Sequence, residues 1–110
     1  MSTERKERVK AVVEQLASKF ILENIGFPGV LVSVTRVEVS DELGNVKIYF
    51  SVFPEAEEDK IIKQVIGLKK ELRAAIAEGM PMKFVPNIEL LPDELIKKQH
   101  KVEELFKKID

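Results

Sequence analysis

The sequence contains no cysteine and no tryptophan, and it has a single histidine. Without cysteine, neither a disulfide nor a thiolate zinc site can form, which is typical of proteins in a reducing cytoplasm. No apolar run approaches the roughly 18 residues that a membrane-spanning helix needs. The charged N-terminal stretch MSTERKERVK does not resemble a secretory signal. We therefore predict a cytoplasmic protein that requires no membrane, metal or cofactor.

Motifs for catalysis are also missing. There is no Walker loop, dinucleotide fingerprint or nucleophile elbow. His100 stands in the charged stretch KKQHKVEE, and no acid or base is arranged around it. Acid–base or metal chemistry needs convergent partners, so we expect His100 to be a solvated surface residue. We predict no enzymatic activity. The competing hypothesis, a small ferredoxin-like enzyme, would require a pocket containing an acid or base with a displaced pKa.

The chain has 110 residues, of which 45% are hydrophobic and 34% are charged. This size and composition fit one small domain spanning residues 1–110, with apolar material for one modest core. Eighteen Lys and Arg against nineteen Asp and Glu give a net charge of −1. The overall charge therefore does not indicate nucleic-acid binding, and only local clusters of basic residues could do so.

The apolar periodicity predicts six elements in the order α-β-β-α-β-α, which indicates an α+β fold with helices on one face of a three-stranded sheet. The expected elements are a helix over 4–25, strands over 30–39 and 46–53, a helix from the acidic run 55–59 to about Gly79, a strand over 82–91, and a helix from Asp93 onward.

Three irregularities are predicted within these elements. The apolar parity of the first strand switches between Val34 and Val37, which predicts a bulge or a strong bend near Thr35–Arg36. Gly67 falls inside the long helix, where a kink is plausible. Pro86 cannot donate a ladder hydrogen bond, so the third strand should lie at an edge of the sheet or contain a bulge.

The tetrapeptide GFPG, residues 26–29, matches the GxxG sequence with which KH domains clamp phosphates. In those domains the loop joins two helices, whereas here it joins a helix to a strand. Pro28 also removes one of the backbone amides. We interpret GFPG as a helix cap followed by a turn.

Basic residues are the better candidates for nucleic-acid contacts. Phosphate contacts require Lys and Arg clustered on one face, whereas solubility requires them only to be dispersed. Charge patterning alone favours the dispersed arrangement. The candidate RNA-binding residues are Arg5, Lys6, Arg8, Lys63, Lys69, Lys70 and Arg73.

A resemblance covers nearly the whole chain. The segment VTRVEVSDELGNVKIYFSVF, the later ELR, and MKFVPNIELLPDELIKKQHKVEELFKKI are similar, in order and spacing, to the ribosome-binding factor A family. This resemblance implies a type II KH-like domain without catalytic residues. It also implies binding to the small ribosomal subunit and its rRNA, a role in late rRNA processing and ribosome biogenesis, and an association with cold shock.

The resemblance further implies that a basic surface contacts rRNA and that Arg73 occupies a family position. The family often has an Ala-x-Gly kink in the long helix. Here that position reads Leu68-Lys69-Lys70, with Gly67 one residue earlier, so the kink could be shifted or absent. Two alternatives stay open: Arg73 could be held by an acid such as Glu89, and the chain could be a non-catalytic protein–protein adaptor. We expect a monomer.

Overall fold

The computed structural model describes residues 2–80 and 86–95. The elements are α1 (Ser2–Asn24), β1 (Leu31–Val39), β2 (Asn45–Phe53), the 3₁₀ turn η1 (Glu55–Glu57), α2 (Glu58–Gly67), α3 (Lys69–Gly79) and β3 (Asn87–Pro92). Glu94 and Leu95 begin a further helix. The predicted α+β class and element order are confirmed. The rest of the predicted last helix lies outside the described residues, and the single-domain expectation for 1–110 stays a prediction.

The three strands form one mixed sheet with β2 in the centre. β1 pairs with β2 in antiparallel fashion, and β3 pairs with the other side of β2 in parallel. Pro86 is buried directly before β3. The predicted edge position of the third strand is therefore confirmed, and one side of β3 is left without a partner strand among the described residues.

A bulge interrupts β1 where the sequence parity changes. Val34 pairs with Phe50 and Arg36 pairs with Tyr49, so Thr35 is an extra residue in β1. Beyond the bulge, Val37 and Val39 are buried. The inserted residue restores the apolar side chains to the core face, as the change of phase predicted.

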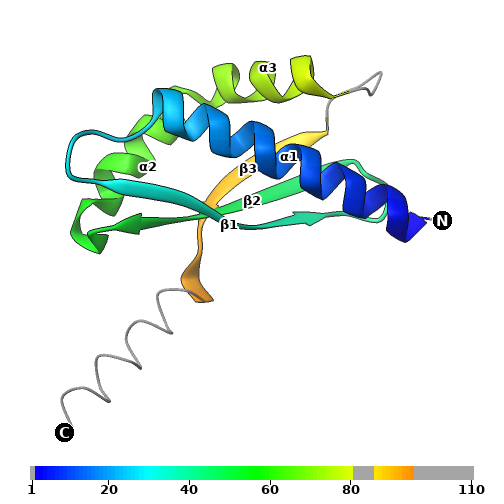
Figure 1. Ribbon diagram of the computed structural model, residues 1–110, viewed down its shortest axis with the longest axis horizontal. Coiled ribbons are helices and arrows are strands. Elements are labelled where there is room, and N and C mark those ends of the chain that lie inside the picture. The colour runs from blue at the N-terminus through cyan, green and yellow to red at the C-terminus, as the bar shows by residue number, and fades with distance from the viewer. Residues whose placement is uncertain (1, 81–85, 96–110) are drawn as a thin grey trace, which may run out of the picture.

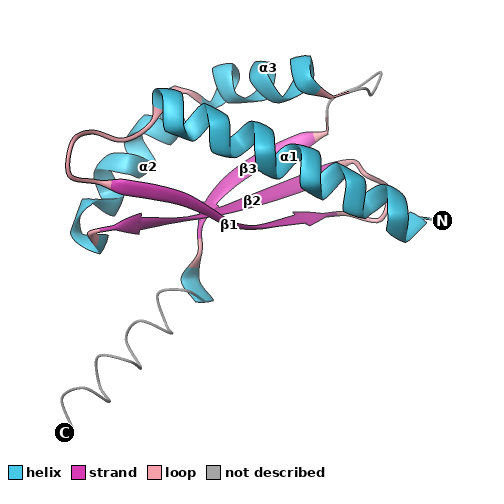
Figure 2. Cartoon of the chain, in the orientation of Figure 1, coloured by secondary structure: helices cyan, strands magenta, loops and turns pink. Residues whose placement is uncertain are grey.

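The helices α1 and α3 lie on the same side of the sheet, as Figure 1 and Figure 2 show. The core fills the space between them and the sheet: Val13 of α1, Ile48 of β2 and Ile76 of α3 are each fully buried. The close approach of α1 and α3 depends on Gly79, since a Cβ there would collide with the Leu16 side chain. The opposite face of the sheet carries none of these helices.

The turn between β1 and β2 uses a left-handed residue that the sequence did not indicate. Asp41, Gly44 and Asn45 supplied the expected turn chemistry, but the positive φ of 60° belongs to Leu43. The Leu43 side chain is buried in the core. Burial of this side chain compensates the cost of about 1–2 kcal/mol for placing a branched residue in the left-handed region.

Within the described ranges, no helix combines the length and the apolar character needed to cross a membrane.

Candidate nucleic-acid interface

The long helix expected after the acidic run is divided at Leu68. This residue has φ −110° and ψ 15°, outside the helical range, although its N–H still donates to the carbonyl oxygens of Gln64 (3.0 Å) and Val65 (3.2 Å). Gly67 has open space where a Cβ would lie. The glycine therefore favours the break through its low helix propensity and not through a steric requirement. The sequence left open whether the long helix is kinked at Gly67; the break lies at Leu68, directly after that glycine.

Lys69 and Lys70 occupy the first turn of α3, directly after this break, and both are exposed. The first N–H groups of a helix are unpaired, and the helix dipole there disfavours cations by about 0.3–1 kcal/mol each. Leu68, which precedes them, has no polar side chain with which to cap the helix. Glu71 stands in the same turn, so this solvent-facing point carries two cations and one carboxylate in addition to the positive end of the helix dipole.

A groove lies beside this point, between the helices and the open edge of the sheet. Its volume is about 500 Å³. Lys69 and Arg73, one helical turn apart, line it from α3, and the exposed Ile66 lines it from α2. Residues Asn87 to Leu91 of β3 form the other wall. We call this the α3–β3 groove.

Arg73 does not form the ion pair with Glu89 that the sequence analysis left open. Arg73 and Glu89 both line the α3–β3 groove, yet no ion pair joins them. Among the described residues, Lys63, Lys69, Lys70 and Arg73 make no ion pair at all. Their charges are therefore available to a ligand without first breaking an internal pair.

Lys6 differs from the other candidates because its ammonium group already has a partner. Its Nζ lies 2.8 Å from Oδ1 of Asp41, in the turn after β1. The hydrogen bond and the charge of Lys6 lower the pKa of the exposed Asp41 carboxyl below its ordinary value of 3.8. The pair connects the first turns of α1 to the β1–β2 turn. Its position gives Lys6 a structural role.

The α1 candidates and the α3 candidates lie at opposite ends of the helical layer. α1 and α3 are antiparallel neighbours, and Leu16 contacts Gly79 at the end of α3. Arg5 is eleven residues from Leu16 and Lys70 is nine from Gly79, so the two clusters are about 30 Å apart along the helices at 1.5 Å per residue. Figure 1 shows the N-terminus beyond the far end of α3. Arg5, Lys6 and Arg8 therefore do not extend the surface around Lys69.

The first amide of the GFPG loop is already occupied by a side chain of α2. The Gly26 N–H donates to Oε1 of Gln64 at 2.7 Å, and the Gln64 amide reaches back to the Gly26 carbonyl oxygen at 3.5 Å. The N–H of Val30 closes a turn on the Phe27 carbonyl at 3.1 Å. The interpretation of this segment as a cap and turn is confirmed, because Gly26 has φ 107° and its amide is occupied.

Asp93 is a polar centre whose contacts the sequence did not reveal. Its side chain is 2% exposed. Oδ2 accepts hydrogen bonds from the Thr35 hydroxyl and from Nε of Arg36, the latter at 3.4 Å, and Oδ1 accepts from the Leu95 N–H at 3.0 Å. Asp93 therefore joins the bulge of β1 to the start of the last helix. The only signals in the sequence were the phase change at Thr35 and the helix start at Asp93.

Arg36 extends this cluster across the face of the sheet that the helices leave open. Its guanidinium lies 3.9 Å from the centroid of the Tyr49 ring, and its Nη1 is 2.6 Å from Oε1 of Glu38. The Tyr49 hydroxyl donates to the other Glu38 oxygen at 3.2 Å. Arg36 is thus occupied by internal partners and is not a candidate for phosphate contact.

The described residues contain no group of three or more His, Cys, Asp or Glu side chains that could hold a metal ion. The expectations of no required metal and no catalysis stay predictions.

The fold is that of a small α+β domain, with a groove between a broken helix and an edge strand whose charged lining residues are Lys69, Arg73 and Glu89. The chain belongs to the ribosome-binding factor A family, whose model matches residues 5–106.

Curated relatives and solved structures agree with this membership. The chain is 31% identical over 110 residues to ribosome-binding factor A of Macrococcus caseolyticus, covering 96% of this chain and 95% of that protein. It is 29% identical over 106 residues to the Thermodesulfovibrio yellowstonii protein of that name, covering 96% and 90%.

The crystal structure of ribosome-binding factor A from Thermus thermophilus superposes with a TM-score of 0.67 at 24% identity, covering 79% of this chain and 93% of that one. A Thermus thermophilus homology model fitted into a cryo-EM map of a 30S complex superposes with a TM-score of 0.62 at 24% identity, covering 74% and 88%. At this identity the two likenesses show the fold.

Proposed function

We propose that this protein binds the small ribosomal subunit and assists the late maturation of its rRNA, as a monomeric, cytoplasmic and non-catalytic factor with a KH-like domain. Family membership supports the proposal, as does the Thermus relative fitted into a 30S complex. The association with growth in the cold, which the resemblance implies, belongs to the same proposal.

The observation that carries the proposal is the group of exposed, unpaired cations around the break between α2 and α3. Lys69 and Arg73 line the α3–β3 groove, and Lys70 stands beside them at the start of α3. Cations at a helix start oppose the dipole, and bound phosphate would offset that cost. We place the principal rRNA contact here, with Lys63 of α2 as a nearby contributor.

Arg5 and Arg8 form a separate candidate contact at the other end of α1. Both are exposed. They lie about 30 Å from Lys70 along the helices. Phosphates along one RNA strand are only several ångströms apart, so a short stretch of RNA backbone does not reach both sites. We propose that Arg5 and Arg8 contact a second segment of rRNA, with Lys6 holding the adjacent turn through Asp41.

The test is binding to purified small subunits, and to whole ribosomes for comparison, measured by co-sedimentation over a range of salt concentrations. The variant Lys69→Ala/Lys70→Ala/Arg73→Ala should bind free small subunits more weakly at low salt. Removing one phosphate-binding side chain lowers the magnitude of the slope of log K against log salt by about one, so the slope of the triple variant should be smaller by about three.

A matched control removes the same number of charges elsewhere: Lys19→Ala/Lys47→Ala/Lys60→Ala. These residues lie on α1, β2 and α2, and Lys60 is paired with Glu57. The control should keep the salt slope of the unaltered protein. An unchanged slope for the α3 triple variant, with its melting temperature preserved, would exclude this surface. Binding that does not depend on salt would favour the protein–protein adaptor.

A further inference from the structure

Two large apolar side chains stand exposed at the end of the sheet where β1 begins and β2 ends. Leu31 is 64% exposed and Phe53 is 70% exposed, and they are direct partners across the β1–β2 ladder. The residue after Phe53, Pro54, is exposed as well. We call Leu31, Phe53 and Pro54 the apolar end patch. Single exposed apolar residues are common on protein surfaces, whereas adjacent ones more often mark a binding surface.

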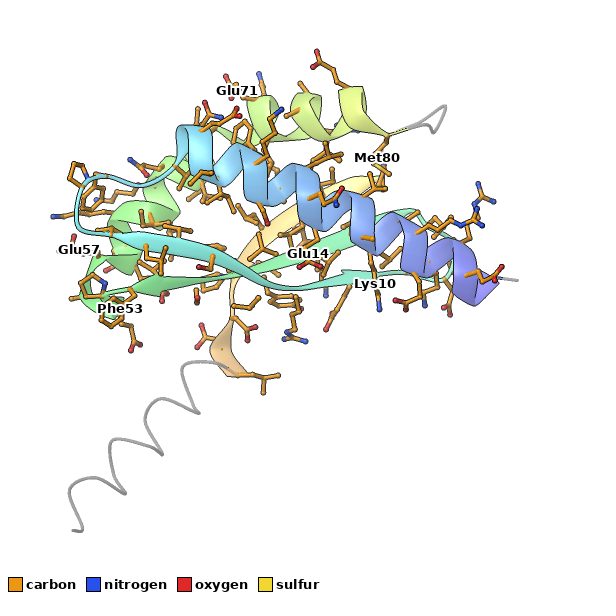
Figure 3. The ribbon with its side chains drawn as sticks, in the orientation of Figure 1. Lys10, Glu14, Phe53, Glu57, Glu71 and Met80 are labelled. Atoms are coloured by element: carbon orange, nitrogen blue, oxygen red, sulfur yellow. The ribbon has the colours of Figure 1, made fainter. Side chains whose placement is uncertain are left out.

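Acidic residues follow this patch directly along the chain. The stretch from Phe53 to Lys60 carries four carboxylates against that single lysine: Glu55, Glu57, Glu58 and Asp59. Figure 3 shows Phe53 and Glu57 at the same end of the molecule. The last turn of α1 contains no basic residue. A phosphate that approached the patch would meet carboxylates, so the patch is unsuited to the RNA backbone.

The start of a helix accounts for only part of this acidic run. Glu58 and Asp59 stand in the first turn of α2, where negative charge interacts favourably with the helix dipole. That role does not explain why exposed apolar side chains stand next to the acids. Glu55 makes no ion pair with another described residue. Its charge is therefore available to a partner.

A lysine of the chain itself shows what these groups can hold. Nζ of Lys60 lies 3.2 Å from Oε2 of Glu57 and 5.7 Å from the centroid of the Phe27 ring. An ammonium group placed between a carboxylate and an aromatic face is attracted by both. Phe53 and Glu55, two residues apart, offer the same pair of groups, and no described cation contacts either of them.

We propose that the apolar end patch docks a lysine- or arginine-rich segment of a small-subunit protein, with an apolar side chain against Leu31 and Phe53 and a basic side chain on Glu55. The choice of a small-subunit protein rests on the proposed function. Proteins that pack against rRNA need many Lys and Arg to neutralise its phosphates, so basic segments are abundant on that particle. The charge of such a segment complements the patch, whereas rRNA has the wrong sign.

Reversal of one charge gives a test whose sign distinguishes protein from RNA. Glu55→Lys should weaken co-sedimentation with purified small subunits, since it would place like charges across the contact. Phe53→Ser should weaken it by about fivefold or more, as loss of an apolar anchor at an interface does. The matched control is Glu42→Lys, the same change in the β1–β2 turn at the opposite end of the ladder. The control should not weaken binding.

Cross-linking identifies the partner directly, because the chain has no native cysteine. Ala56 is exposed between Glu55 and Glu57, so Ala56→Cys can carry a benzophenone maleimide and leave the patch intact. The labelled full-length protein is bound to small subunits and irradiated. We expect the cross-link on a small-subunit protein, and mass spectrometry of the digested product should place it in a segment rich in Lys and Arg.

Each other outcome overturns the proposal. Cross-links to rRNA, or tighter binding by Glu55→Lys, would assign the patch to RNA. Cross-linked dimers that form without small subunits and increase with protein concentration would assign it to a second copy of the chain. Unchanged affinity for both Glu55→Lys and Phe53→Ser would show that the patch contacts nothing on the small subunit.

Two further readouts separate this proposal from other failures. A melting temperature lowered by about 4 °C or more in Phe53→Ser would assign this side chain to the fold and overturn its docking role. Failure of the proposed function has a different signature, because the unaltered protein would then also fail to co-sediment with small subunits.

Discussion

Replacing Asp93 by Ala tests whether this buried carboxylate holds the bulge of β1 to the end of the sheet. The change removes the acceptor for the Thr35 hydroxyl and for Nε of Arg36, and it removes the side chain that caps the N–H of Leu95. The peptide backbone of Asp93, which donates to Phe50, is left in place. The substitution therefore isolates the side-chain hydrogen bonds.

The expected loss can be worked from those hydrogen bonds. A hydrogen bond to a charged group contributes about 1.5–3 kcal/mol, and loss of a helix N-cap costs about 1 kcal/mol. Arg36 adds little, because its side chain is 38% exposed and stays paired with Glu38. The total is about 3 kcal/mol, which corresponds to a fall in melting temperature of roughly 10–20 °C for a domain of this size.

Urea and thermal unfolding at neutral pH, followed by circular dichroism, measure this loss. Asp93→Asn keeps an acceptor oxygen and should lose only about 1 kcal/mol, since a neutral hydrogen bond replaces a charged one. Glu89→Ala, an exposed change on β3, is the control. A double-mutant cycle with Thr35→Val should give a coupling of about 1–2 kcal/mol. A loss below about 1 kcal/mol for Asp93→Ala, or zero coupling to Thr35, would refute this role for the carboxylate.

Four further predictions concern stability and can be measured by urea unfolding. Gly67→Ala should raise the free energy of unfolding by up to about 1 kcal/mol, because open space surrounds the site; Gly79→Ala should lower it by about 1–3 kcal/mol, because the new Cβ collides with α1. Leu43→Gly should destabilise despite its positive φ, since relief of about 1–2 kcal/mol is smaller than the roughly 2–5 kcal/mol of a buried leucine side chain. Asp41→Asn should lower the free energy of unfolding at neutral pH. Because Lys6 lowers the pKa of Asp41, this difference should vanish as the pH falls below 3.8 through the lowered pKa. A difference that persists in stronger acid would show another cause.

The features that the sequence predicted correctly follow from local covalent rules. A strand has a side-chain period of two, so the change of parity between Val34 and Val37 could only be satisfied by an extra residue. Glycine lowers helix propensity wherever it occurs, so Gly67 made a break plausible at this point without deciding it. Pro86 lacks an N–H, which limited the third strand to an edge or a bulge. None of these inferences required knowledge of which segments meet in space.

The features that the sequence missed depend on contacts between distant residues. Thr35 and Asp93 are separated by 58 positions, and Lys6 and Asp41 by 35. Nothing in the local pattern of either partner identifies the other. The same limit applies to the candidate site: the basic residues were visible, but the packing of α1 against α3, which separates Arg5 from Lys70, is a tertiary property.

The order in which the strands meet has a consequence for when the protein acquires its groove during synthesis. The β1–β2 pairing joins neighbours in the chain, from Val39 with Val46 outward, whereas β3 pairs Asn87 with Asn45 across the whole α2–α3 connection. Long-range pairings form more slowly than hairpins, since a larger loop must close first. A nascent chain that has emerged as far as Gly79 already carries Lys69 and Arg73 but has no opposite wall. The groove can therefore form only after β3 has been synthesised and has paired with β2.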